Sequence, residues 1–198
     1  IVSATVEKRR YKRGDLIVEQ GKISGALFMI LAGKVRVLSQ DERGREVIMA
    51  TLEVGDCIGE MSLIDGSPRS ADVVSCEPCE LLVIAKSDFA HALSENVDLC
   101  LNIMKSLVLR LREANRKIES LALMDVYGRV AKLLLDFSEM DHGARVIKRK
   151  VTKQDMAKMV GASREMVSRV MKDLEERGFI QTQENGSIVV KERLNALG

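Results

Sequence analysis

The sequence predicts an α+β chain in which a strand-rich N-terminal part, one long helix and a C-terminal helix–turn–helix follow one another. Three observations support this class: short apolar segments broken by glycines over residues 11–90, an apolar stripe at helical spacing over residues 99–121, and two capped helical segments that flank Gly161. The chain has 198 residues, 46% hydrophobic and 30% charged, which is typical of a globular protein with one large or two small domains. We expect parts at residues 1–97, 98–124 and 125–198.

The N-terminal part has the pattern of a β-sandwich or barrel. Residues 34–38 alternate between polar and apolar side chains, which is the period of a strand with one buried face. Residues 41–44, Asp-Glu-Arg-Gly, have the composition of a hairpin turn, and a strand is expected to follow at residues 47–52. Residues 11–21 are expected to form a strand, a turn, a second strand and a turn, and further apolar strands are expected at residues 27–31 and 81–84. Many short strands at such spacing favour a sandwich or barrel.

The long helix carries one apolar stripe, formed by Leu99, Ile103, Leu107, Leu111, Ala114, Ile118 and Leu121. Neither Gly nor Pro interrupts residues 90–126, so the helix is expected to extend about 30 Å or more at 1.5 Å per residue. A narrow stripe of that length is typical of a two-stranded coiled coil. The sequence therefore predicts a homodimer through residues 98–123. The alternative is a helix that packs only on its own domain.

The C-terminal part reads as a winged helix. Asp125 is placed to cap a helix that runs to about Met140, and Thr152 and Ser163 are placed to cap two shorter helices. Gly161 permits the sharp turn between those two helices. Asn185-Gly186, within a turn at residues 184–187, predicts a two-residue type I′ hairpin between strands at residues 179–183 and 188–190.

The second short helix presents the chemistry of a DNA reader. Inward positions at Val167, Val170, Met171 and Leu174 leave Arg164, Glu165, Ser168 and Arg169 facing outward. An arginine fork matches guanine O6 and N7, and a glutamate accepts from cytosine N4. Thr152, Lys153 and Ser163 suit phosphate oxygens. Lys and Arg also outnumber Asp and Glu over residues 141–198. An ordinary charged surface helix is the alternative to DNA binding.

The segment at residues 59–71, Gly-Glu-Met-Ser-Leu-Ile-Asp-Gly-Ser-Pro-Arg-Ser-Ala, has the chemistry of an anion site. Gly59 and Glu60 open a short helix whose amides can face an anion. Arg69 can return to the same place and pair with a phosphate, while Glu60 can accept from a ribose hydroxyl. For an isolated pair of these residues the alternative is a salt bridge.

This segment resembles the phosphate-binding cassette of cyclic-nucleotide-binding domains. With the glycine-punctuated strands, the long helix and Arg164-Glu165…Arg169, residues 10–195 resemble the cyclic-AMP receptor protein (CRP/FNR) family of bacterial transcription regulators. The resemblance implies an N-terminal β-roll (a cyclic-nucleotide-binding jelly-roll), a long dimerisation helix and a C-terminal winged helix–turn–helix. It also implies a cytoplasmic homodimer that binds a palindromic TGTGA-like operator in double-stranded DNA and works with RNA polymerase.

The same resemblance assigns ligand contacts residue by residue. It implies that Arg69 and Ser70 hold the cyclic phosphate, that Glu60 holds the ribose 2′-OH and that Gly59 gives a backbone contact. The other expected ligand-binding residues are Met61, Ser62, Ala71 and Asn115. Arg164, Glu165 and Arg169 are implied to read the operator half-site.

The sequence departs from the family where the base would be recognised. The family's cyclic-AMP sensors carry a Thr-Ser pair on the dimer helix, and the matching residues here are Ala114 and Asn115. Cyclic AMP (cAMP) is the first expectation, followed by cyclic GMP (cGMP) or cyclic di-GMP (c-di-GMP), which Arg110, Arg112 and Arg116 would attract. Met166 also stands where some relatives have a phosphate-contacting Thr. A ligand-independent regulator, and a nucleotide-binding module that acts on a protein partner, are the further alternatives.

Other functions have little support in the sequence. The longest apolar run, residues 26–32, is far shorter than the about 20 residues of a membrane span. Cys76 and Cys79 have metal-site spacing, but no second ligand pair accompanies them, so we expect reduced thiols and no metal. Two separate histidines without a nucleophile motif predict that the chain is not an enzyme. Because it begins at Ile1, we expect the native protein to start further upstream.

Overall fold

The computed structural model describes residues 7–141, 143–148, 151–183, 185–191 and 194. The chain divides into two compact units, Ile1–Val108 and Leu109–Gly198, and the boundary falls inside the helix α3 (Val97–Leu123). The predicted α+β class is confirmed, with strands dominating the first unit and helices with a small sheet forming the second. His142 and Glu184, which belong to predicted loops, lie outside the described residues.

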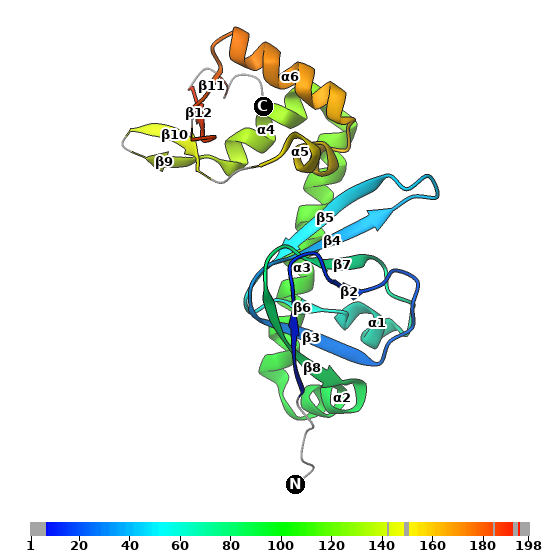
Figure 1. Cartoon of the computed structure of the whole chain (residues 1–198). Helices are drawn as coiled ribbons and strands as arrows, with labels where there is room; N and C mark the ends of the chain where they lie inside the picture. The colour runs from blue at the N-terminus through cyan, green and yellow to red at the C-terminus, as the bar shows by residue number, and fades with distance from the viewer. Residues whose placement is uncertain (1–6, 142, 149–150, 184, 192–193, 195–198) are drawn as a thin grey trace. The chain divides into compact units, whose positions relative to one another are not determined.

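Two four-stranded antiparallel sheets form the first unit (Figure 1), with strand orders β1-β8-β3-β6 and β2-β7-β4-β5. Both sheets contribute apolar side chains to one core, including Phe28, Ile30 and Leu81 from the first and Val35 and Val73 from the second. The predicted sandwich of short strands is therefore present. The strands are β1 (Glu7–Tyr11), β2 (Leu16–Val18), β3 (Ala26–Ala32), β4 (Val35–Gln40), β5 (Glu46–Leu52), β6 (Cys57–Ile58), β7 (Asp72–Ser75) and β8 (Cys79–Ala85).

Three strands and one helix of this unit were not predicted. β1 consists of charged and aromatic residues that stay largely exposed, so it lacks the apolar alternation that marks a half-buried strand. β6 has two residues and β7 four, and both are too short for a periodic signal. The helix α2 (Lys86–Glu95) buries Phe89 in a small cluster with Leu27 and Leu63.

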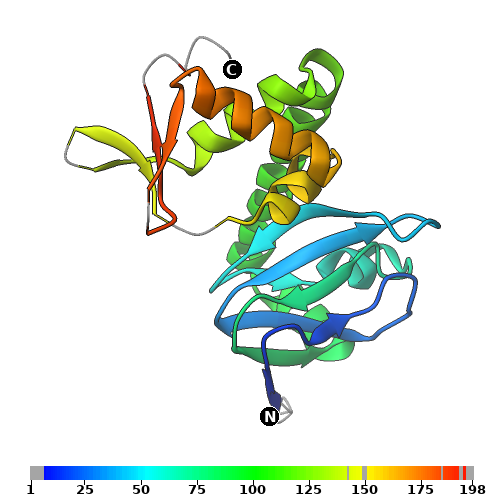
Figure 2. The same cartoon turned by 45° about the horizontal axis from the view of Figure 1, so that its top comes forward.

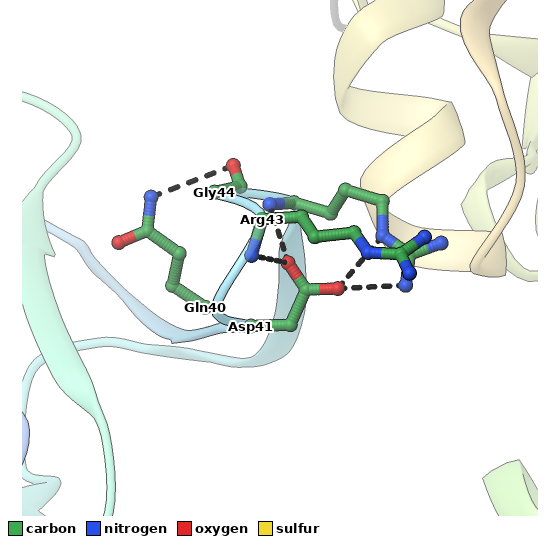
Figure 3. A network of polar contacts seen from close by, with 5 residues as sticks. Gln40, Asp41, Arg43 and Gly44 are labelled. Atoms are coloured by element: carbon green, nitrogen blue, oxygen red, sulfur yellow. Dashed lines mark hydrogen bonds and ion pairs between the residues drawn. The ribbon is translucent and has the colours of Figure 1, made fainter.

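The predicted hairpin turn joins β4 to β5 and is organised by Asp41 (Figure 3). Its carboxylate accepts from the backbone N of Arg43 at 3.0 Å, the backbone N of Arg45 at 2.9 Å and Nε of Arg45 at 2.7 Å. The pKa of Asp41 is lowered, most by the hydrogen bond from the Arg45 backbone and next by the hydrogen bond from the Arg45 side chain. The amide of Gly44, at φ 76°, donates to the Asp41 carbonyl at 2.9 Å. Polar contacts around Asp41 thus hold the turn between β4 and β5.

The long helix α3 has no buried residue, but its two apolar faces differ. Leu99, Ile103 and Leu107, the first half of the predicted stripe, are half-buried, and Ile103 packs against the cluster around Phe89. A second row, formed by Leu101, Met104, Val108, Leu111, Asn115 and Ile118, is exposed and its steps alternate between three and four residues. We call these six residues the exposed seam. The first half of the predicted stripe is thus half-buried in the single chain, and pairing of two chains through residues 98–123 stays a prediction.

The second unit packs its helices over a small sheet of order β11-β12-β10-β9 (Figure 2). Val130, Leu134, Met156, Val167 and Leu174 lie at the centre of its core. The Asp125 side chain caps α4 as predicted, but that helix ends at Phe137 and Met140 lies in a strand. The elements are α4 (Val126–Phe137), β9 (Glu139–Asp141), β10 (Ala144–Ile147), α5 (Lys153–Val160), α6 (Arg164–Glu176), β11 (Ile180–Thr182) and β12 (Ile188–Val190).

The hairpin between β11 and β12 is closed by two backbone hydrogen bonds. Gln183 N donates to the Ser187 carbonyl at 2.9 Å, and Gly186 N donates to the Gln183 carbonyl at 2.9 Å. Gly186 has φ 82°. Gly186 thus takes the left-handed conformation that glycine adopts without strain. Glu184 lies outside the described residues, so the type I′ turn stays a prediction.

Candidate functional site

The first candidate site surrounds Arg69, whose side chain is only 4% exposed. Its Nη1 donates to the Gly59 carbonyl at 2.7 Å, and its Nη2 donates to the carbonyl of Ala26 in β3. The Arg69 backbone is also fixed, because its N donates to the Lys22 carbonyl at 2.9 Å and its O accepts from Gly21 N at 2.8 Å. A loop residue is thereby turned into the interior of the first unit.

Gly59 allows the guanidinium to lie against the backbone. Gly59 precedes α1 (Glu60–Asp65) in the left-handed conformation, with φ 89°. A Cβ atom at this position would lie 1.8 Å from Nη1 of Arg69. Glycine is required here both for the backbone conformation and for this close approach.

We predict that Gly59→Ala destabilises the protein by several kcal/mol more than Gly66→Ala. Gly66, at the other end of α1, has φ 75° and open space around its Cβ position, so its replacement costs only the left-handed strain of about 1–2 kcal/mol. At Gly59 the new methyl group must also displace a buried, hydrogen-bonded guanidinium. Urea unfolding of the two variants measures the difference. Equal losses would contradict the close approach.

The charges around Arg69 suit an anionic ligand. Burial lowers the pKa of Arg69, while the nearby negative charge of Glu60 raises it. Nε of Arg69 is buried and has no hydrogen-bond acceptor among the described residues. An arginine keeps its charge when buried, so an unused donor on a desolvated cation favours a bound anion such as a phosphate.

The other predicted ligand residues differ in their exposure. Glu60 is 4% and Ser62 8% exposed on α1, and Ala71 is also buried, whereas Met61 and Ser70 are exposed. Asn115 is exposed on α3 in the second unit. The carbonyl of Ala26, which holds Nη2 of Arg69, was not predicted because no side chain marks a backbone acceptor.

The second candidate site is the helix pair α5 and α6, whose predicted caps are both present. Thr152 Oγ1 accepts from Asp155 N at 3.0 Å, and Ser163 Oγ accepts from Met166 N at 3.1 Å. Gly161 is left-handed at φ 65° and its N–H donates to the Ala157 carbonyl, which closes the turn. The predicted helix–turn–helix is therefore present.

Helix α6 buries one face and exposes the predicted reading face. Arg164, Glu165 and Arg169 are exposed, Ser168 is half-buried, and Thr152, Lys153 and Ser163 are exposed around the two helix starts. The exposed side chains include two arginine forks and one carboxylate, the types that read base edges. The inward positions Val167, Val170, Met171 and Leu174 are all buried.

The described residues show neither a metal-binding cluster nor a membrane-spanning helix. Among the described residues, no three His, Cys, Asp or Glu side chains gather into a group that could hold a metal ion. All four cysteines are described and none forms a disulfide. No described helix combines the length and the apolar character that a bilayer crossing demands.

Known protein families match both parts of the chain. Residues 8–96 match the cyclic nucleotide-binding domain family, and residues 128–197 match the Crp-like helix-turn-helix domain family. The cAMP-activated global transcriptional regulator Vfr of Pseudomonas aeruginosa is 36% identical, covering 94% of this chain and 90% of its own length. The cAMP-activated global transcriptional regulator CRP of Salmonella typhimurium is 34% identical, covering 86% of this chain and 83% of its own.

Solved structures share the architecture. The c-di-GMP responsive global regulator CLP of Xanthomonas campestris has a TM-score of 0.82 at 28% identity and is matched over 93% of each chain. A CRP/FNR-family transcriptional regulator of Thermus thermophilus has a TM-score of 0.77 at 26% identity, covering 96% of this chain and 97% of its own.

A cyclic-nucleotide-binding β-rich domain joined to a Crp-like helix–turn–helix defines a ligand-binding, DNA-binding transcription regulator. The chain belongs to the CRP/FNR family of transcription regulators, as the sequence predicted. This is a family of regulators and not of enzymes, which confirms the prediction that the chain is not an enzyme.

Proposed function

We propose that this regulator binds cyclic AMP in its β-rich domain and, as a homodimer, a palindromic TGTGA-like operator through α6. The observation that carries the proposal is the buried guanidinium of Arg69, which keeps an unused Nε–H beside a glycine backbone. This arrangement fits a cyclic phosphate. Arg69 and Ser70 would hold that phosphate, Glu60 the ribose 2′-OH and Gly59 a backbone contact, with Met61, Ser62 and Ala71 completing the site.

The choice of nucleotide depends on Ala114 and Asn115. The relatives Vfr and CRP are described as cAMP-activated, whereas CLP is described as c-di-GMP responsive, so the family alone does not select the base. Ala114 has no hydrogen-bonding side chain, and Asn115 offers an amide to a purine edge. Calorimetric titration with cyclic AMP, cyclic GMP and cyclic di-GMP tests the proposal. Cyclic AMP is expected to bind most tightly, and tighter binding of either competitor would overturn the assignment.

The proposed homodimer forms through α3. The exposed seam gives an apolar row on an otherwise charged helix, with Leu111 60% and Ile118 64% exposed. Steps of three and four residues are those of a two-stranded coiled coil, so a second copy of the same helix fits this row. Asn115 lies within the row, which would place it at the dimer interface.

The proposed division of labour follows the sequence boundaries. Residues 1–97 bind the nucleotide, 98–124 dimerise and form the hinge, and 125–198 bind DNA. A cytoplasmic protein that works with RNA polymerase is consistent with this family. A module that acts on a protein partner would not need α5, α6 and the adjoining hairpin, so DNA binding is favoured.

We predict that Arg169→Ala weakens binding to a TGTGA-containing operator by about 1–3 kcal/mol, because it removes a bidentate base contact. Lys153→Ala is the matched control, since a phosphate contact weakens binding to every sequence about equally. Fluorescence anisotropy with the operator and with a scrambled duplex measures both effects. An equal loss on both duplexes for Arg169→Ala would assign Arg169 to a phosphate instead.

A further inference from the structure

One arginine outside both candidate sites joins three elements of the second unit. Arg129, half-buried on α4, donates from Nη1 to the Met124 carbonyl at 2.7 Å and from Nε to the Val160 carbonyl at 2.9 Å. Met124 follows the last residue of α3, and Val160 is the last residue of α5. A single side chain therefore holds the end of the long helix to the end of the first helix of the helix–turn–helix.

Leu121, in the last turn of α3, also lies close to the turn that follows α5. A Cβ atom at Gly161 would lie 3.6 Å from Cδ2 of Leu121, which is ordinary van der Waals contact. The last turn of α3 thus lies against the turn between α5 and α6. Asp125 also ties the start of α4 by accepting from Gly128 N at 2.8 Å.

The connection between α3 and α4 is short. Helix α3 ends at Leu123 and α4 begins at Val126, so only Met124 and Asp125 separate the two helices. Such short breaks are where hinge motions are absorbed. The Arg129 guanidinium reaches both carbonyls because its two donors, Nε and Nη1, are separate nitrogen atoms, whereas a lysine carries all its donors on one nitrogen.

We propose that Arg129 is a positioning residue, which fixes the helix–turn–helix to the last turn of α3 so that a movement of α3 reaches α6. This inference rests on the proposed regulation by a nucleotide. A ligand can change DNA affinity only through an element that both sites bias. With the two Arg129 hydrogen bonds intact, a movement of α3 is passed on to α6. Without them, the movement is absorbed at Met124–Asp125 and does not reach α6.

The test compares DNA affinity with and without cyclic AMP in Arg129→Gln and Arg129→Lys. The operator dissociation constant is measured by fluorescence anisotropy in both states, and nucleotide affinity without DNA by calorimetry. We expect the ratio of the two operator constants to fall by about tenfold or more in Arg129→Gln, and less in Arg129→Lys, while nucleotide affinity stays within about threefold of the parent. Arg145→Gln is the matched control, since Arg145 donates to Ser138 Oγ at 3.2 Å within the same unit.

A merely structural role gives a different result. If Arg129 only stabilises the fold, both operator constants rise by the same factor and the ratio is unchanged, which overturns the proposal. A parent protein with a ratio near one would instead overturn the proposed nucleotide regulation.

A measurement without nucleotide tests, whatever the result above, whether Arg129 holds the helix–turn–helix to the end of α3. Spin labels are introduced as non-canonical amino acids at Glu119 on α3 and Lys172 on α6, with excess unlabelled chain. Pulsed dipolar spectroscopy is expected to give a broader distance distribution in Arg129→Gln than in the parent or in Arg145→Gln. An unchanged distribution would overturn the inference.

Discussion

Arg69→Gln is expected to weaken the binding of cyclic AMP by about 100-fold or more. Two charge-assisted hydrogen bonds to a phosphate contribute about 1.5–3 kcal/mol each, and every 1.4 kcal/mol corresponds to about a tenfold change in affinity. The effect is expected to be large because Arg69 is buried and its pKa is lowered chiefly by that burial. A bound anion offsets the cost of the desolvated charge, which glutamine does not carry. Calorimetry on the full chain measures the change.

Two further variants separate this effect from damage to the fold. Arg10→Gln removes a charge from β1, where the side chain is 86% exposed, and is expected to leave nucleotide affinity unchanged. Arg69→Lys keeps the charge but loses the fork that reaches both Gly59 and Ala26, so an intermediate loss is expected. Thermal unfolding without nucleotide checks that each variant is folded. An Arg69→Gln protein that is folded and binds cyclic AMP with parental affinity would show that the pocket is elsewhere.

The sequence predicts local structure correctly where a single residue decides the backbone conformation. Thr152, Ser163 and Asp125 cap helices because a short polar side chain before a helix has an amide three residues ahead to accept from. Gly161 closes its turn because glycine adopts positive φ without strain. The Arg69 cassette was also recognisable by its resemblance to a family, and the match of residues 8–96 confirms the kind of domain that it indicated.

Contacts between distant segments could not be read in the same way. Arg129 looks like one polar residue of an amphipathic helix, and its two acceptors are carbonyls of Met124 and Val160 that leave no mark in the sequence. On α3 the periodicity showed an apolar surface but not its division into two faces. Only the tertiary structure shows that Ile103 covers its own unit while Leu101 and Met104 stay exposed.

The division of α3 into a half-buried face and the exposed seam leads to the second prediction with a large expected effect. Leu111→Glu is expected to convert the dimer to a monomer and to weaken operator binding by about 100-fold or more, because a monomer contacts only one of the two half-sites. Leu111 belongs to the exposed seam and is 60% exposed in one protomer. A carboxylate there would be buried against its copy, and burial of an unpaired charge costs several kcal/mol. Sedimentation velocity and fluorescence anisotropy measure the two results.

Leu109→Glu provides the matched control on the same helix. Leu109 is 61% exposed, so it equals Leu111 in residue type and exposure, but it lies outside the exposed seam. It is expected to remain dimeric and to bind the operator with parental affinity. If Leu109→Glu dissociates the dimer and Leu111→Glu does not, the pairing face is the opposite side of α3. In that case Asn115 lies away from the partner helix and cannot contact a ligand across the interface.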